Sequence, residues 1–531
     1  MHPGIILLIG GLGSLLARKK YNFFTALISG LAALVIIPTL NPGAYWSFSY
    51  LDFELLLFRV DGPAQIMGVV LTLAALGALL FARLSAGSKF YLLAPLYAGS
   101  SLMVVFAGDL LTFFVFWELM TISSFFLILN SRQRRTKITG IYYFLMHMVG
   151  GLSLLGAVMV HYGETGHLML APLQAGQPWL ILALGIKMAF IGVHTWLPRT
   201  YSRVPYHISV FLAIFTTKIG IYGVFRLLEP HNFLIWGGGC SALLGVILAL
   251  RANKLRTILC YSIITKLGYV LVTMGSGSWI SRMGGLMYLT NHIIYKTLLF
   301  MISGIIIYAT GKEKLDQLGG LACKMPFTMV CTLLASAAAA GLPLTGSYIS
   351  KIILKEGLTS GPYILLTLIE VGTILVFLKV FYSVFLKKQK RNTVFRKKPP
   401  LSLQAPLLIL VSVIFIPGLR PKPVFNLMEL EETVLELSFF QPYFLWSSLQ
   451  PVLIAGLLFA AGYFVGSRDF LGLEPGFQHR KYLNFDPYLQ SKKYYLLVGE
   501  KFSYWHNGDL SRYLFWAFNI LLFIWISLLW R

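Results

Sequence analysis

Long apolar runs separated by short polar segments dominate this sequence. The run at 326–358 is too long for one straight crossing, and Gly341, Pro343 and Gly346 interrupt it, so it predicts one broken helix. The pattern predicts an all-α polytopic membrane protein with about sixteen transmembrane helices. Counting runs of about 17 to 25 residues places them at 3–18, 22–38, 64–84, 89–107, 109–130, 139–160, 177–198, 205–228, 234–250, 257–275, 281–309, 326–358, 362–386, 403–420, 448–466 and 513–530.

A second break lies in the stretch from Leu182 to Leu228. Two apolar segments there flank a polar interruption at His194, Pro198 and Pro205. A helix broken inside a membrane is tolerated only where its free backbone groups meet protein or water. One broken helix in each half of a chain is typical of transporters built from inverted repeats. We therefore expect two inverted helix repeats, each with one broken helix.

This organisation divides the chain into four parts. They are the N-terminal helices (1–108), a first core half (109–228, break near 187–205), a second core half (229–386, break near 341–351) and C-terminal helices (387–531). The last part contains a basic and aromatic segment, 467–512. Its composition fits an interfacial cytoplasmic element and equally fits a solvated loop.

Composition supports the membrane class. Of 531 residues, 57% are hydrophobic and only 12% charged, and the mean hydropathy is +0.74. The net charge of +24 could suggest a nucleic-acid partner, but the basic residues lie in short loops between apolar runs. That placement follows the positive-inside rule and puts these loops in the cytoplasm. An even number of helices then places both termini on the outer face of the cell (inner) membrane.

The two sets of loops differ in charge. The set expected in the cytoplasm contains Arg18, Lys19, Lys20, Arg83, Lys89, Arg132, Arg134, Arg135, Lys137, Arg199, Arg203, Arg251, Lys254, Arg256, Lys312, Lys314, Lys324 and the run Lys387 to Lys398. The opposite set carries Asp52, Glu54, Asp61, Glu164, Glu229 and the cluster Glu429, Glu431, Glu432 and Glu436.

Ionisable residues inside the apolar runs form the candidate site. They are Glu118, Lys187, Lys218, Lys266, His292, Lys296, Lys351, Glu370 and Lys379, with His194 and His207 beside the first break. A lysine at bilayer depth costs several kcal/mol, so it usually faces a partner or a wet cavity. Ordinary interpretations exist: Lys379 and Glu370 could hold helices together, Lys266 could reach the outer interface, and His147 could be a satisfied core histidine.

The chemistry of this set suits proton movement. Desolvation lowers the pKa of a lysine and a neighbouring carboxylate raises it again, so a lysine with a movable partner can hold or release a proton. His292 and Lys296 are four residues apart and share one helix face. No nucleotide-binding or hydrolytic motif is present, and the four cysteines show no metal-binding spacing. We predict no cofactor and no metal, and do not decide whether the chain counts as an enzyme.

Five motifs occur in one order: FWELMTISSF, GIKMAFIGVHTWLPRTYSRVPYHISVFLAIFTTKIGIYGVFR, RANKLRTILCYSIITKLGYV, NHIIYKTLLFMISG and GLPLTGSYISK. Together they resemble the antiporter-like subunits of respiratory complex I, of Mrp cation/proton antiporters and of energy-converting membrane-bound hydrogenases. The resemblance covers residues 60–390 and is closer to the Mrp/hydrogenase-related branch.

The resemblance implies roles for single positions. Glu118 matches the glutamate that pairs with the broken-helix lysine, here Lys187, and Lys218 matches the bridging lysine. His292 and Lys296 match the H-x-x-x-K motif of the family, and Lys351 its terminal lysine or glutamate. We treat His194, His207, Lys266, Glu370 and Lys379 as accessory candidates. Arg199 and Lys266 depart from the residues that are common in the family.

Two functions follow from the resemblance. The first is a subunit that translocates protons, or exchanges Na+ for H+, within a multi-subunit complex related to complex I, Mrp antiporters or hydrogenases. Its partners would be small Mrp-type membrane subunits and a peripheral redox or catalytic module. The alternative is a non-pumping membrane partner that anchors a catalytic protein or supplies it with protons, as in CO2-accumulating complexes. The sequence does not separate H+ from Na+.

Overall fold

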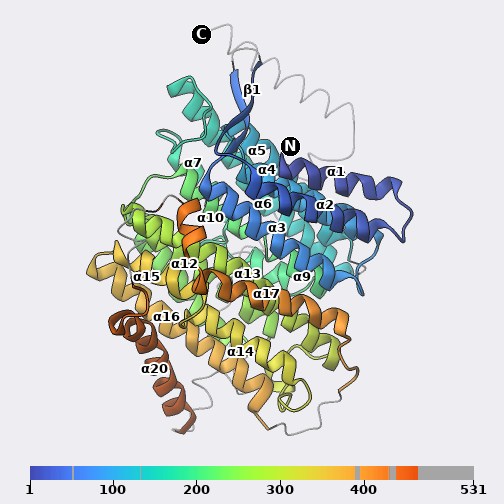
Figure 1. Ribbon diagram of the computed structural model, residues 1–531, viewed down its shortest axis with the longest axis vertical. Coiled ribbons are helices and arrows are strands. Elements are labelled where there is room, and N and C mark those ends of the chain that lie inside the picture. The colour runs from blue at the N-terminus through green and yellow to red at the C-terminus, as the bar shows by residue number, and fades with distance from the viewer. Residues whose placement is uncertain (51–52, 132, 389–394, 429, 431–437, 465–531) are drawn as a thin grey trace, which may run out of the picture. The chain divides into compact units, whose positions relative to one another are not determined.

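The computed structural model describes residues 1–50, 53–131, 133–388, 395–428, 430 and 438–464, all in one unit that spans residues 1–475. A second unit, 476–531, falls outside this description. The helices are α1 (Pro3–Leu16), α2 (Asn22–Ile36), α3 (Gly62–Ala82), α4 (Ser88–Val105), α5 (Leu110–Leu129), α6 (Arg134–Thr165), α7 (Gln177–Lys187), α8 (Trp196–Tyr201), α9 (Tyr206–Leu212), α10 (Thr216–Leu227), α11 (Asn232–Arg251), α12 (Leu255–Met274), α13 (Trp279–Thr310), α14 (Pro326–Ala340), α15 (Gly346–Glu356), α16 (Ser360–Phe381), α17 (Leu401–Leu419), α18 (Lys422–Leu427) and α20 (Pro442–Phe464) (Figure 1).

The predicted helical membrane architecture is confirmed. Among the described residues, 11 helices are long and apolar enough to cross a membrane, and α1 and α14 are shorter apolar helices. Every expected range from 3–18 to 448–466 contains a helix. The last predicted helix (513–530) and the basic segment 467–512 lie outside the described residues.

A β-hairpin is the main departure from the predicted all-α class. Strands β1 (Gly43–Tyr50) and β2 (Phe53–Val60) pair antiparallel, with Gly43 opposite Val60. Residues of β2 such as Phe58 and Val60 are buried. A search for apolar runs of about 17 to 25 residues misses such an element because each strand has only 8 residues.

The predicted helix at 205–228 consists of two helices. α9 ends at Leu212 and α10 begins at Thr216, so the chain breaks a third time. Neither glycine nor proline occurs between residues 206 and 219. Because glycine and proline are the residues that mark helix ends in a sequence, the pattern gave no sign of this break.

Loops predicted to share one side of the membrane contact one another. The Arg256 guanidinium forms an ion pair with Glu313 (2.8 Å) and donates a hydrogen bond to the Val204 carbonyl (2.5 Å). Thr136 in turn donates to the carbonyl of Arg203 (3.2 Å). The basic loops before α6, after α8, before α12 and after α13 therefore lie together, as the charge pattern predicts.

Contacts also join loops at the opposite ends of the helices. The Arg226 guanidinium at the end of α10 lies 2.5 Å from the carboxylate of Asp61, which caps α3. Burial alone would raise the pKa of Asp61, but the Arg226 charge holds it below its usual range. Leu173, between α6 and α7, donates its amide hydrogen to the Leu227 carbonyl (2.9 Å).

Helix α13 supplies the centre of the core. It packs against α12, α15, α3, α14, α17 and α9 (Figure 1). Its residues from Met283 to Ile306 are buried except at Asn291, which is half-buried. A polar side chain on α13 therefore faces protein on every side, and α13 carries His292 and Lys296.

Candidate functional site

Three of the buried lysines lie where a helix is broken. The Lys218 ammonium donates a hydrogen bond to the carbonyl of Ala213, which follows α9. The Lys351 ammonium donates to the carbonyl of Ala340, the last residue of α14 (2.9 Å). Lys187 is itself the last residue of α7. Carbonyls at a helix C-terminus lack intrahelical partners and carry partial negative charge, so the breaks provide sites for ammonium groups.

Left-handed backbone conformations shape both predicted breaks. Ala189 has a φ of 57° and Leu344 a φ of 71°. Such a conformation costs a residue with a Cβ roughly 1–2 kcal/mol. In the first break, the Trp196 indole donates to the Ile186 carbonyl near the end of α7 (2.9 Å). In the second, a Cβ on Gly341 would collide with the Lys351 side chain. The packing around each break therefore maintains a strained chain path.

Lys187 is held by neutral groups. Its side chain is buried, and its ammonium donates to the Thr121 hydroxyl (2.9 Å) and lies 4.3 Å from the centre of the Trp117 ring. Glu118, on the same helix as both, makes no ion pair within the described residues, although its charge interacts with that of Lys187. Its Oε1 is buried without a hydrogen-bond partner there, against Gly151 of α6. The predicted pair is thus separated in this conformation.

A row of hydroxyl groups lies next to this region. The Ser124 and Tyr143 hydroxyls are 2.9 Å apart, and the Tyr143 and Thr216 hydroxyls 3.2 Å apart. Thr216 also bonds the hydroxyl of Tyr97. The row joins α5, α6, α10 and α4, and includes Thr216, which lies two residues before Lys218. Such groups both donate and accept hydrogen bonds.

His292 and Lys296 lie deep in the core on α13. The Lys296 ammonium donates to the Ser262 hydroxyl on α12 and lies 5.2 Å from the centre of the Phe377 ring. Neither ring nitrogen of His292 has a hydrogen-bond partner among the described residues. Lys266 is also buried, and its ammonium lies 4.9 Å from the Tyr269 ring. The interpretation that Lys266 reaches the outer interface therefore does not hold in this structure.

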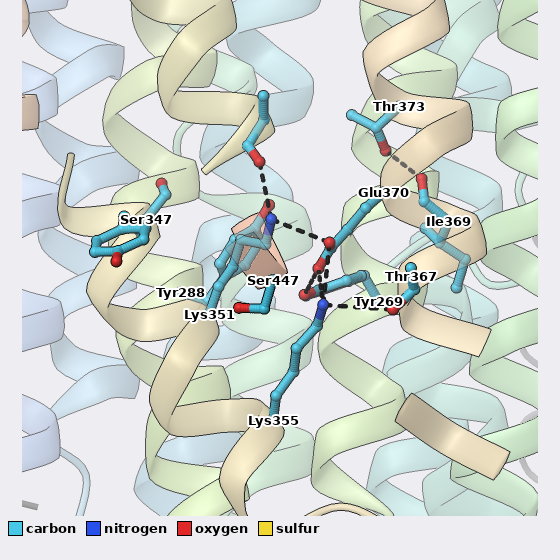
Figure 2. A network of polar contacts seen from close by, with 12 residues as sticks. Tyr269, Tyr288, Ser347, Lys351, Lys355, Thr367, Ile369, Glu370, Thr373 and Ser447 are labelled. Carbon is cyan, nitrogen blue, oxygen red and sulfur yellow. Dashed lines mark hydrogen bonds and ion pairs between the residues drawn. The ribbon is translucent and has the colours of Figure 1, made fainter. Parts of the chain in front are cut away.

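Lys351 belongs to a cluster of polar side chains around the carboxylate of Glu370. Its ammonium lies 3.1 Å from Glu370, which also lies 3.1 Å from the ammonium of Lys355. Tyr269 donates its hydroxyl hydrogen to the same carboxylate (2.6 Å). Figure 2 shows both lysines, one turn apart on α15, pointing at the carboxylate from α16.

Comparison with known sequences places the candidate residues within a described family. Residues 107–376, about half of the chain, match the family model described as "NADH:quinone oxidoreductase/Mrp antiporter, TM". The chain belongs to this family. The predicted resemblance is confirmed, and the match includes the candidate residues from Glu118 to Glu370; Lys379 lies just beyond it.

Individual relatives of this antiporter family show how far the likeness extends. An uncharacterised protein of Mycobacterium tuberculosis is 31% identical over 294 residues, which are 50% of this chain and 46% of that protein. NADH-quinone oxidoreductase subunit N of Desulforudis audaxviator is 28% identical over 371 residues, covering 62% and 74%. This chain thus spans about half the length of the mycobacterial relative.

A solved structure extends the likeness to the whole fold. A chain of the membrane-bound sulfane sulfur reductase, an archaeal respiratory membrane complex, superimposes with a TM-score of 0.77 at 22% identity. The superposition covers 99% of both chains. At this identity the similarity establishes the antiporter-like fold.

The remaining accessory candidates have other neighbours. The Lys379 ammonium donates to the carbonyls of Leu250 and Ala252 at the end of α11. This geometry is that of a helix cap and fits the interpretation that Lys379 holds helices together. His207 bonds Ser85 (3.0 Å), and His194 is half-buried in the first break with an unbonded Nδ1 among the described residues. His147 contacts the Tyr143 carbonyl through Nδ1 (2.9 Å), and its Nε2 has no hydrogen-bond partner among the described residues.

The sequence analysis missed Lys355. It lies four residues after Lys351, and this spacing places both on one helix face. That spacing was visible in the sequence, but Lys355 is close to the end of α15, where a lysine usually reaches water. Only the fold brings it to Glu370.

Proposed function

We propose that this chain moves protons through the membrane along an axis formed by Glu118, Lys187, Lys218, His292, Lys296 and Lys351. It would do so as one subunit of a multi-subunit complex of the Mrp, complex I or hydrogenase kind. Exchange of Na+ for H+ is the second form of the same proposal. The two halves, each with a lysine at a helix break, are consistent with an inverted-repeat transporter.

The bonding of the lysines carries the proposal. Lys187, Lys218 and Lys296 are buried, and each donates to a neutral oxygen: a hydroxyl, a carbonyl and a hydroxyl. A carboxylate partner would hold a buried lysine in its charged form. A neutral acceptor instead allows the amine to lose its proton without leaving a carboxylate stranded. These residues are therefore suited to gain and lose protons.

Unsatisfied polar atoms support a hydrated path. Buried atoms without a hydrogen-bond partner among the described residues include Glu118 Oε1, His147 Nε2, Thr217 Oγ1 and both nitrogens of His292. Buried polar groups are normally hydrogen-bonded to protein or water. Water molecules at these positions would connect the lysines, and protons pass along such chains.

The chain should be unable to pump by itself. Moving one proton against about 100 mV requires roughly 2.3 kcal/mol, and the axis offers titratable groups but no source of that energy. We expect the complex purified through this chain and reconstituted in vesicles to acidify or alkalinise their interior when a Na+ gradient or its electron donor is supplied. A pH-sensitive dye reports the rate.

The control is the same chain reconstituted alone, which should move no protons uphill. Uphill transport by the chain alone, without any imposed cation gradient, would contradict the dependence on partners. A purified complex that moves no ions under any drive would instead favour the non-pumping membrane partner.

We further propose that the basic loops face the cytoplasm and that both termini lie outside. In a chain with the exposed Cys240 and Cys323 replaced by alanine, a membrane-impermeant maleimide should label Glu164→Cys in intact cells. It should label Lys397→Cys only after permeabilisation. The reason is the excess of lysine and arginine in the set of loops that contains Lys397. Labelling of Lys397→Cys in intact cells would reverse this orientation.

A further inference from the structure

The cluster around Glu370 borders a cavity that none of the proposed axis residues other than Lys351 reaches. This cavity of about 230 Å³ lies between α15, α16 and α20. Its lining includes Lys351, Lys355, Glu356, Tyr363, Tyr443 and Ser447. Such a volume holds several water molecules, each of which occupies about 30 Å³ in the liquid. Ammonium, carboxylate and hydroxyl groups in the lining make the cavity polar.

Glu370 contacts two of the lysines that line this cavity, Lys351 and Lys355. Its side chain is 1% exposed, that of Lys351 3% and that of Lys355 9%. The Lys355 ammonium lies within 3.1 Å of both carboxylate oxygens. Lys351 has a second acceptor, the Ala340 carbonyl, at 2.9 Å. Lys351 can therefore leave the carboxylate without losing all its hydrogen bonds, and Lys355 then remains with Glu370.

Tyrosines connect this cluster with α13. Tyr269 donates to Glu370, and its ring lies 5.0 Å from that of Tyr288. The Tyr288 and Tyr295 hydroxyls are 3.4 Å apart, and the Tyr295 ring lies 5.3 Å from that of His292. Ring contacts and hydroxyl hydrogen bonds of three tyrosines thus link His292 with Glu370.

We propose that Glu370, supported by Lys355, is the group through which protons of the axis exchange with water in this cavity. The inference rests on the proposed function. The Lys351 ammonium gives its proton to the Glu370 carboxylate, which leaves a neutral amine and a neutral carboxylic acid. The acid then gives the proton to a water molecule that enters beside Lys351 and Lys355, the two lysines that line the cavity, and becomes a carboxylate again. The Lys355 ammonium stabilises that negative charge. Uptake follows the same steps in reverse.

The first test uses the intact purified complex in vesicles. Glu370→Gln should lower proton translocation per assembled complex at least about tenfold, because a carboxamide accepts no proton. Lys355→Met should lower it similarly, whereas Lys355→Arg keeps a positive charge beside Glu370 and should retain most of the rate. Lys324→Met, at an exposed lysine, is the matched control and should behave as wild type.

The second test does not depend on changing a charged residue. In the background without Cys240 and Cys323, Ser447→Cys places a thiol in the cavity lining. A positively charged thiol reagent should then slow translocation by complexes that are already assembled. The same reagent on Glu164→Cys, at an exposed position near the end of α6, should not.

The outcomes separate the two proposals. One result would overturn this inference and leave the proposed function intact. In that result the wild-type complex translocates protons, and Glu370→Gln, Lys355→Met and reagent-treated Ser447→Cys all run at the wild-type rate. Failure of the wild-type complex itself to translocate would overturn both.

Discussion

Glu118→Gln and Lys187→Met should each abolish ion translocation while the complex still assembles. In this conformation Lys187 donates to Thr121, and Glu118 makes no ion pair among the described residues. Removing either charge therefore breaks no ion pair that holds α5 to α7. If the pair closes during turnover, each variant loses the step in which the carboxylate keeps the lysine protonated.

The double variant distinguishes a moving pair from a structural one. Stranding one member of a permanently buried pair costs about 3–5 kcal/mol, and removing both relieves that cost. A pair that merely held helices together would give poorly assembled single variants with normal translocation in whatever assembles. We expect the reverse: good assembly of all three variants, measured by co-purification of partner subunits, and no translocation. Wild-type translocation by Lys187→Met would end the hypothesis of a moving pair.

Lys296→Met should have the second large effect. Lys296 is a buried lysine on α13 within the proposed axis, and its loss leaves His292 without its neighbour. We expect translocation to fall at least about a hundredfold, which corresponds to roughly 2.7 kcal/mol of added barrier. Stability should change little, because Lys296 bonds a neutral hydroxyl and its removal strands no carboxylate.

Lys296→Arg tests why the lysine is needed. A guanidinium keeps the positive charge but does not give up its proton in proteins. If the residue must release a proton, the arginine variant should be as inactive as the methionine variant in the vesicle assay. Activity of Lys296→Arg close to wild type would mean that only the charge matters.

Much of this site could be predicted from the sequence because its residues are conspicuous. A lysine such as Lys187 or Lys296 inside an apolar run is rare, and the breaks after Lys187 and before Lys351 are marked by proline or glycine. The break before Lys218 has no such residue, and only the fold reveals it. A local pattern detects an unusual residue and misses a helix break among ordinary ones.

Partners across helices could not be predicted in the same way. Glu370 and Lys355 come from two helices, and nothing local to either segment indicates that they meet. Lys379 shows how little residue type alone distinguishes. In the sequence it looks like the axis lysines, but its ammonium caps α11. The separation of Glu118 from Lys187 is likewise a property of one conformation, which a sequence does not specify.

The comparison of two equally buried lysines tests directly whether protons move through Lys296. Lys296 and Lys379 have exposed fractions of 0% and 1%, but only Lys296 lies on the proposed axis. The measurement is the initial rate of proton translocation per assembled complex in vesicles for Lys296→Met and Lys379→Met. We expect the rate of the first variant to be at least about a hundredfold lower than that of the wild type. The second variant should keep a near wild-type rate per complex, even if fewer complexes assemble. Translocation by Lys296→Met at the wild-type rate would contradict it.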